Sequence, residues 1–137
     1  MTSRSNGEPL DLMARGTVFE QVGGMDTFRR LADAFYTRVE ADAFLRPMFG
    51  QDLGEAREHL ALFLAQYFGG PATYSEQRGH PRLRMRHMPF KIGRAERDAW
   101  LRHMLAALDE VGIPEPAYTA MRAYFDHAAT FLINKAE

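Results

Sequence analysis

Apolar residues recur at every third or fourth position in four long segments of the chain, with polar residues between them. This spacing is typical of amphipathic helices, whose apolar side chains share one face. Helices are predicted over residues 25–40, 53–68 and 94–111, and from Pro114–Pro116 to the end of the chain. Few windows alternate between apolar and polar residues strongly enough to indicate a strand. The pattern therefore predicts an all-α fold.

Short elements are predicted in the connections between these helices. Residues 17–22 have room for one or two helical turns before Gly23–Gly24. Residues 41–49 form a short segment that Pro47 keeps from growing into a longer helix. Residues 71–79 are predicted to be a loop.

The start of the chain carries no such periodicity. Residues 1–16 are polar with scattered glycine and proline, and they are predicted to be a flexible lead-in with one turn at residues 10–13. Residues 17–137 are enough for one domain with one hydrophobic core.

Residues 80–92, with the sequence HPRLRMRHMPFKI, differ from the rest of the chain. Pro81 and Pro89 bracket the segment, so at most two helical turns fit between them. Four of its residues are arginine or lysine, and apolar residues separate them. A short element with apolar side chains on one side and cations on the other suits the mouth of a pocket for an anionic ligand. A solid four-helix bundle, the commoner form of such a chain, has no need of it.

Three large amphipathic aromatic residues lie on the predicted apolar stripes: Tyr36, Tyr67 and Trp100. A buried tyrosine or tryptophan needs a hydrogen-bond partner for its polar atom. Backbone carbonyls are the commoner partners, but three inward-facing aromatic residues can also point at a shared polar ligand. Both interpretations stay open at this level.

Composition and charge limit the classes of function. Hydrophobic residues make up 46% and charged residues 26% of the chain, the balance of a soluble globular protein. The formal net charge of -1 provides no overall cationic field for nucleic acid. Cysteine is absent, which excludes disulfides, zinc–thiolate sites, iron–sulfur clusters and cysteine nucleophiles. With no apolar run of membrane-spanning length and no signal peptide, the expected location is cytoplasmic, with no membrane partner.

The polar residues match none of the common catalytic motifs. Ser3, Ser5 and Ser75 lie in the tail and in a predicted loop, which argues against a hydrolytic triad. No glycine-rich phosphate loop and no HExxH motif is present. Glu55 and His59 stand four positions apart, but no second pair repeats them. A metal held by side chains alone is therefore not expected, whereas a metal held by a cofactor and one histidine stays open.

His87 stands in a different setting from the other histidines. Met88 and Pro89 stop the helical path directly after it, so a tight local structure fixes the position of its ring. This raises its rank as a metal ligand only modestly, and spacing alone does not lead to a particular cofactor. The remaining histidines are interpreted as surface or structural residues: His59, His80, His103 and His127.

The segment TYSEQRGHPRLRMRHMPFKI at residues 73–92, followed shortly by ERDAWL, resembles the group II truncated haemoglobins. The helix stops at Gly23–Gly24 and at Gly69–Gly70, with Pro71 after the second, match the same family. The resemblance extends from residue 17 to the end of the chain. It implies a truncated globin, a two-over-two helical sandwich that encloses haem b (iron protoporphyrin IX).

The resemblance also implies roles for individual polar residues. His87 matches the proximal histidine, which binds haem iron through one ring nitrogen. Trp100 and Tyr36 match residues on the ligand side, where each can donate a hydrogen bond. Tyr74 and Arg86 match residues near the haem propionates, and an arginine is well suited to bind such an anion.

Apolar residues complete the expected haem site. Phe49 matches a residue that packs on the porphyrin, and Ala56 and Leu60 match positions on the distal side. Four residues are spaced to share one helix face: Ala56, Leu60, Phe63 and Tyr67. Such a face suits the flat apolar plate of a porphyrin.

Phe49 is a departure from part of the family, because several relatives carry tyrosine at its place. The donors are therefore expected to be Tyr36 and Trp100 alone. Ala56 stands where many full-length globins keep a distal histidine, and its small side chain leaves the route into the pocket more open. A hydrogen bond to a charged partner contributes about 1.5–3 kcal/mol, so each donor is expected to slow oxygen release by roughly one to two decades.

Three functions are weighed on this basis. The first is reversible binding of dioxygen and other small diatomic ligands at ferrous haem iron, as in oxygen transport. The second is a redox enzyme on the same site, which oxidises nitric oxide with bound oxygen or reduces peroxide. No flavin or nicotinamide motif is present, so a reductase is expected to be a separate protein. The third, a haem-free bundle acting as a binding module, conflicts with the motif match, and the oligomeric state, a homodimer included, stays open.

Overall fold

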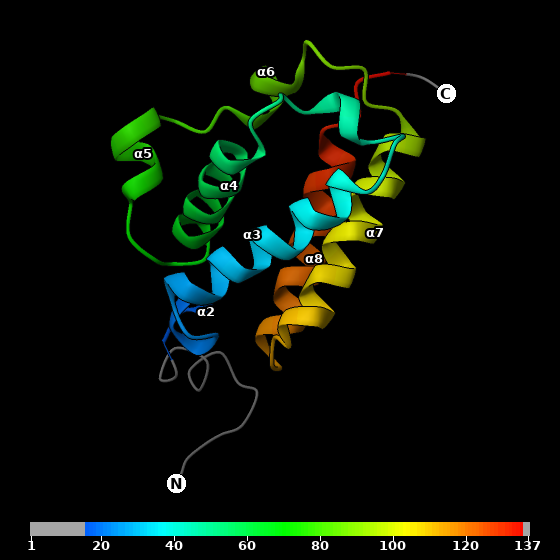
Figure 1. Cartoon of the computed structure of the whole chain (residues 1–137). Coiled ribbons are helices and arrows are strands. Elements are labelled where there is room, and N and C mark those ends of the chain that lie inside the picture. The colour runs from blue at the N-terminus through cyan, green and yellow to red at the C-terminus, as the bar shows by residue number, and fades with distance from the viewer. Residues whose placement is uncertain (1–15, 136–137) are drawn as a thin grey trace, which may run out of the picture.

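The computed structural model describes residues 16–135, and this part of the chain is helical, with no strand. Four long helices make up most of it: α3 (Met25–Glu40), α4 (Leu53–Tyr67), α7 (Arg94–Val111) and α8 (Ala117–Phe131). A short helix, α2 (Val18–Gln21), precedes them, and the 3-10 helix η1 (Arg46–Met48) and the helices α5 (Thr73–Arg78) and α6 (Leu83–His87) lie between them (Figure 1). The predicted lead-in and its turn at residues 10–13 lie outside the described residues, apart from Gly16. No helix in the described range is long and apolar enough to cross a membrane.

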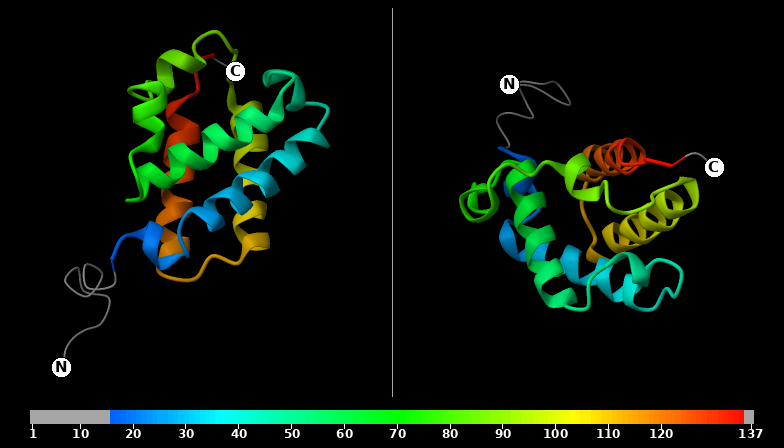
Figure 2. Two further views of the ribbon diagram at one scale, coloured as in Figure 1. Left: turned by 60° about the vertical axis from the view of Figure 1, so that its left-hand side comes forward. Right: turned by 90° about the horizontal axis from the view of Figure 1, so that it is seen from above.

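The four long helices form two layers. Helix α3 packs against both α4 and α7, and α7 packs in turn against α8. The pair α3–α4 therefore lies across the pair α7–α8, as two further views show (Figure 2). The core between them contains side chains that are at most 1% exposed: Phe28, Leu31, Phe35, Met104, Leu108, Met121 and Phe125. The predicted all-α, two-over-two architecture is confirmed.

Three of the predicted long helices agree with the structure closely. Helices α3 and α7 have the predicted ends, and α4 ends at Tyr67, one residue before the predicted position. Gly112 ends α7 with a φ of 81°, a left-handed conformation that glycine adopts at little steric cost. For these helices, local periodicity and helix stops are sufficient to predict where each helix begins and ends.

The loop predicted over residues 71–79 is wrong, because helix α5 forms there. An amide on α4 holds it: Gln66 Nε2 donates to Ser75 Oγ at 2.7 Å, and the Ser75 backbone N–H donates to Gln66 Oε1 at 2.9 Å. Tyr74 is only 5% exposed, and its ring packs edge-on against Phe63. A helix of six residues is marginal by itself, so these contacts with α4 stabilise it.

The last helix is shorter than predicted. It begins at Ala117 and ends at Phe131 instead of continuing along the rest of the chain. After the helix, the backbone N–H of Asn134 donates to the carbonyl oxygen of Ile92 at 2.8 Å. The chain therefore leaves the helix to make contact with the segment that follows α6.

Candidate functional site

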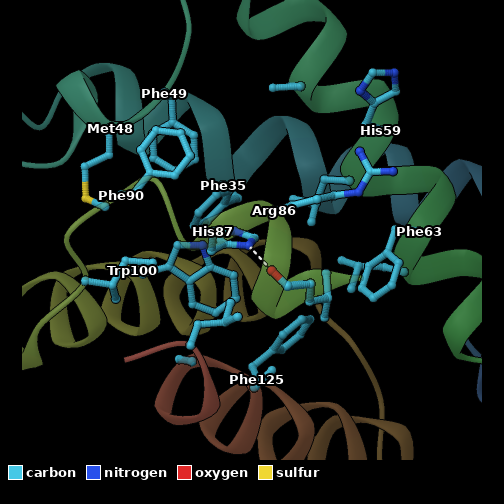
Figure 3. Close-up of a pocket in the computed structure, with 18 of the residues that line it drawn as sticks. Phe35, Met48, Phe49, His59, Phe63, Arg86, His87, Phe90, Trp100 and Phe125 are labelled. Carbon is cyan, nitrogen blue, oxygen red and sulfur yellow. Dashed lines mark hydrogen bonds between the residues drawn. The ribbon is translucent and has the colours of Figure 1, made fainter. Parts of the chain in front are cut away.

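A cavity of about 440 Å³ lies among α3, α4, α6, α7 and α8, within the size range of small-molecule sites. All nine residues that the resemblance places at a haem site line it: Tyr36, Phe49, Ala56, Leu60, Phe63, Tyr74, Arg86, His87 and Trp100. Figure 3 shows Met48 and Phe49 on one side of the cavity, and His59 and Arg86 on the other. The basic side chains of His59 and Arg86 thus lie together at one side of the cavity, with Phe63 beside them.

Helix α4 supplies one wall of the cavity. Ala56, Leu60 and Phe63 are half-buried and line it, as their spacing predicts. The prediction that Tyr67 shares this wall is wrong, because Tyr67 is 55% exposed and does not line the cavity. Its ring instead packs on that of Tyr124 in α8, with the centroids 4.1 Å apart. Leu64 is the last α4 residue that lines the cavity, so Tyr67 meets a different neighbour.

His87, the last residue of α6, lines the cavity. Its Nδ1 lies 2.7 Å from the backbone carbonyl oxygen of Leu83, one turn earlier (Figure 3). Only a protonated Nδ1 can donate to a carbonyl, so in the neutral ring Nε2 carries the lone pair. Nε2 makes no hydrogen bond with another described residue. A carbonyl that fixes tautomer and ring orientation in this way is the usual support of a metal-binding histidine.

Arg86, which precedes His87, supports the backbone around it. Its Nε donates to the carbonyl oxygen of Pro81 at 2.8 Å, and its Nη2 donates to that of Arg78 at 3.3 Å. A guanidinium has five N–H donors, so three remain for other acceptors. Arg86 can therefore brace this segment and bind an anion in the cavity at the same time.

Tyr36 of α3 is 6% exposed, and its ring packs edge-on against those of Phe35 and Phe49. The ring-centroid distances are 4.9 Å and 5.5 Å respectively. Its hydroxyl makes no hydrogen bond within the described part of the chain. Burial raises the pKa of Tyr36 to about 12, while the nearby Arg57 guanidinium acts in the opposite direction with a smaller effect. The hydroxyl therefore stays protonated and can donate to a molecule in the cavity.

Trp100 of α7 is held between two core aromatic residues. Its ring centroid lies 5.3 Å from that of Phe35 and 6.0 Å from that of Phe125. Its indole N–H, which can only donate, has no acceptor among the described residues. Phe35 contacts the rings of both Tyr36 and Trp100, so one fully buried side chain supports both donors.

The interpretation of His59 as a surface or structural residue needs correction, because His59 lines the cavity. Its Nε2 lies 3.2 Å from Nη1 of Arg78, and the Arg78 guanidinium lies 5.9 Å from the centroid of the Tyr74 ring. The helical spacing indicates this position, since His59 follows Ala56 by three positions and directly precedes Leu60. Basic residues thus gather around Tyr74 at one side of the cavity.

His103 has a structural contact away from the cavity. Its Nε2 lies 2.7 Å from Oδ2 of Asp42, and both side chains are largely buried. Asp42 Oδ1 accepts hydrogen bonds from the backbone N–H groups of Phe44 and Leu45. The hydrogen bond with His103 is the main reason that the pKa of Asp42 is lowered. This contact ties α7 to the connection that brings Leu45 and Phe49 to the cavity.

The donor set of the cavity fits a haem. No group of three or more histidine, aspartate or glutamate side chains within residues 16–135 is arranged to hold a metal ion. The cavity offers instead the Nε2 of His87, which has no partner among the described residues, together with apolar walls and basic residues. His87 would hold the iron, the apolar side chains would contact the ring, and Arg86 would pair with a propionate.

Known proteins resemble this chain over most of its length. A family model of bacterial-like globins matches residues 17–134. The group 2 truncated hemoglobin YjbI of Bacillus subtilis (strain 168) is 39% identical over 114 residues, which cover 83% of this chain and 86% of that protein.

Solved structures are similar as well. The hemoglobin of the thermophilic phototrophic bacterium Chloroflexus aurantiacus has a TM-score of 0.86 and 64% identity, and the match covers 87% of this chain and 98% of that one. The group II truncated hemoglobin of Bacillus anthracis has a TM-score of 0.86 and 36% identity, with 89% of this chain and 99% of that one covered.

Proposed function

This chain belongs to the group II truncated haemoglobins of the bacterial-like globin family, and we propose that it binds dioxygen reversibly at the ferrous iron of haem b. Trp100 and Tyr36 are proposed to stabilise the bound ligand. The observation that supports this best concerns three polar atoms without a partner among the described residues: His87 Nε2, Trp100 Nε1 and Tyr36 Oη. All three belong to residues that line one largely apolar cavity.

His87 is proposed to bind the iron through Nε2. Its Nδ1–H donates to the Leu83 carbonyl, which keeps the proton on Nδ1 and leaves the lone pair of Nε2 available. Haem supplies, when bound, an iron with one coordination position open to a diatomic ligand. The family relationship supports haem as the cofactor, and the b form is our proposal.

Trp100 and Tyr36 are proposed to donate hydrogen bonds to dioxygen in the cavity. Both are carried by long helices and packed against Phe35, so neither needs a large rearrangement before it donates. A hydrogen bond to a charged acceptor contributes about 1.5–3 kcal/mol, or one to two decades in a rate of release. Phe49 supplies no third donor, so the stabilisation depends on these two residues.

Arg86 and Tyr74 are proposed to bind the propionates. Arg86 has three N–H donors left after its two backbone hydrogen bonds. Arg78 and His59 line the same side of the cavity and add to its basic character. The walls formed by Leu60, Phe63 and the other apolar side chains are proposed to hold the ring and exclude water.

The same donors favour a second candidate, a redox enzyme that dioxygenates nitric oxide or reduces peroxide. Because the pKa of Tyr36 is raised to about 12, its hydroxyl is protonated at neutral pH and can donate to a peroxide as well as to dioxygen. Trp100 can donate to either as well. Both reactions consume electrons, which we propose come from a separate reductase protein.

Stopped-flow measurement of oxygen release from the ferrous protein tests the first candidate. Slow release that returns ferrous protein supports oxygen binding, and rapid release that Trp100→Phe does not alter argues against it. Steady-state turnover of nitric oxide or peroxide, with a reductant present, tests the second. Repeated turnover at a rate above that of haem oxidation alone would make the enzyme the better assignment.

A further inference from the structure

The segment that carries His87 has little secondary structure to hold it. Helix α6 has five residues and no buried one, and Arg82 before it adopts the strained left-handed region with a φ of 47°. The hydrogen bonds of Arg86 and of the His87 ring reach no further than Arg78 at the end of α5, Pro81 and Leu83, all within nine positions of His87. A helix this short is not stable by itself, so something else must fix its position.

Asn134, which lies beyond the end of α8, supplies that connection. Its Nδ2 donates to the carbonyl oxygen of Phe90 at 2.8 Å and to that of His87 at 3.2 Å. Its Oδ1 accepts from the backbone N–H of Ile92 at 2.8 Å, and its own N–H donates to the Ile92 carbonyl at 2.8 Å. Within the described residues, the hydrogen bonds that join residues 80–92 to distant parts of the chain come from Asn134 and from the Lys135 backbone alone.

The side chain of asparagine matches this task closely. One acceptor and two donors are needed on a short side chain, and the asparagine amide provides all three. Aspartate would keep the acceptor for Ile92 but would place a carboxylate oxygen against the carbonyls of His87 and Phe90. Alanine would remove all three side-chain contacts and leave the backbone ones.

We infer that Asn134 is a positioning residue for His87. It holds the carbonyl of that residue and the turn after it, and it thereby sets the direction in which Nε2 enters the cavity. This inference rests on the proposed function, in which Nε2 binds haem iron. It adds that the segment after α8 controls the bond between protein and iron through hydrogen bonds that do not touch the haem.

The test compares Asn134→Asp and Asn134→Ala with Gln66→Glu in the haem-loaded protein. Gln66 is the matched control, because its amide clamps α5 to α4 as the Asn134 amide clamps the segment after α6. Resonance Raman spectra of the ferrous, ligand-free forms report the iron–histidine stretching band. Both Asn134 variants should shift and broaden this band and release haem to an acceptor protein about tenfold faster, and Gln66→Glu should leave the band at the wild-type position.

The same Asn134 substitution in a His87→Gly variant distinguishes a positioning role for Asn134 from a general loosening of the cavity. In His87→Gly protein with added imidazole, the metal ligand is no longer attached to the backbone. Adding Asn134→Asp there should leave the iron–imidazole band unchanged. A shift of equal size in this background, or a wild-type iron–histidine band in both single variants, would overturn the inference. If circular dichroism shows that Asn134→Ala does not fold, Asn134→Asp alone decides the test. That variant keeps the acceptor for the Ile92 N–H and the backbone hydrogen bonds from residues 134 and 135 to the Ile92 carbonyl.

The proposed function fails by a different result. If His87→Gly keeps a five-coordinate ferrous spectrum without imidazole, His87 is not the iron ligand, whatever the Asn134 variants do. If His87→Gly loses that spectrum and the Asn134 variants match wild type, the proposed function stands and only the positioning role is rejected.

Discussion

The proposed hydrogen-bond donors and the proposed iron ligand are held in place in different ways. Tyr36 and Trp100 belong to the 16-residue α3 and the 18-residue α7, and both rings pack against Phe35, which is 0% exposed. His87 belongs to a helix of five residues with no buried side chain. Its neighbour Met88 is 60% exposed. Tyr36 is thus part of the hydrophobic core and Trp100 packs against it, whereas the proposed iron ligand belongs to a helix that buries no side chain.

This difference shows that the orientation of a functional side chain can have two physical origins. A close-packed core fixes Tyr36 and Trp100, because their rings have few other places to go. A small set of directional hydrogen bonds fixes His87, because its short helix buries too little surface to do so. Substitution of Tyr36 or Trp100 should therefore remove a hydrogen-bond donor and leave the geometry of the cavity intact. Substitutions around His87 should change that geometry.

The largest effect is expected from His87→Gly, which removes the only proposed protein bond to iron. The ferrous, ligand-free spectrum should lose its five-coordinate histidine form, and added imidazole should restore it. The exposed His127, changed to alanine, serves as the control and should leave the spectrum unaltered. An unaltered spectrum in His87→Gly without imidazole would show that His87 is not the iron ligand.

Trp100→Phe and Tyr36→Phe compare the contributions of the two proposed donors to oxygen binding. Each should speed oxygen release by about ten- to a hundredfold, with the larger effect at Trp100. The indole can only donate and is rigid, whereas the tyrosine hydroxyl rotates and can also accept. Carbon monoxide is a weaker acceptor and should respond less to either change.

Oxygen dissociation rates of the two variants, measured at one temperature, check this ranking. A larger effect of Tyr36→Phe would make the hydroxyl the main donor. If neither rate changes, bound oxygen is not held by these residues.

Alkaline stability tests how deeply Tyr36 belongs to the core. Its pKa is raised from 10.0 to about 12 by burial. Between these pH values the unfolded chain releases the proton and the folded chain keeps it, so the free energy of unfolding falls as the pH rises. The contribution of Tyr36 to this loss is on the order of 2 kcal/mol.

Urea unfolding of wild type and Tyr36→Phe at pH 8 and near pH 12 measures this contribution. The variant should lose less stability than wild type between the two pH values. An equal loss in both proteins would show that Tyr36 titrates as it does in water and is not held by the core.

The smallest effects are expected at the basic side of the cavity. Arg86→Ala and Tyr74→Phe should each speed haem transfer to an acceptor protein by a factor of about two to five, with the fold intact. Arg86 is exposed, and an exposed ion pair contributes only about 0–1 kcal/mol, which limits the effect of Arg86→Ala. Arg30→Ala, an exposed arginine on α3, is the control. Unchanged haem transfer in the Arg86 and Tyr74 double variant would contradict the anchoring role.

Much of this molecule follows from local sequence. Apolar residues at helical spacing predict α3 and α7 with the ends that the structure has, because one apolar face and its stops lie within a single window. The segment at residues 73–92, with ERDAWL after it, is enough to recognise the family. It also points to nine site residues, and these lie around one cavity, while their individual roles remain predictions.

Tertiary structure alone decided the remainder. The loop predicted before residue 80 is a helix because Gln66 clamps it, and Tyr67 leaves the cavity wall because Tyr124 of α8 stands beside it. Asn134 lies 47 positions from His87, so no local window contains both. Periodicity reports which face of a helix is apolar, but it does not report which distant residue each face or helix end will meet. These tertiary contacts depend on how elements far apart in the chain pack. They include the hydrogen bonds from Asn134 that hold the segment of His87 in place.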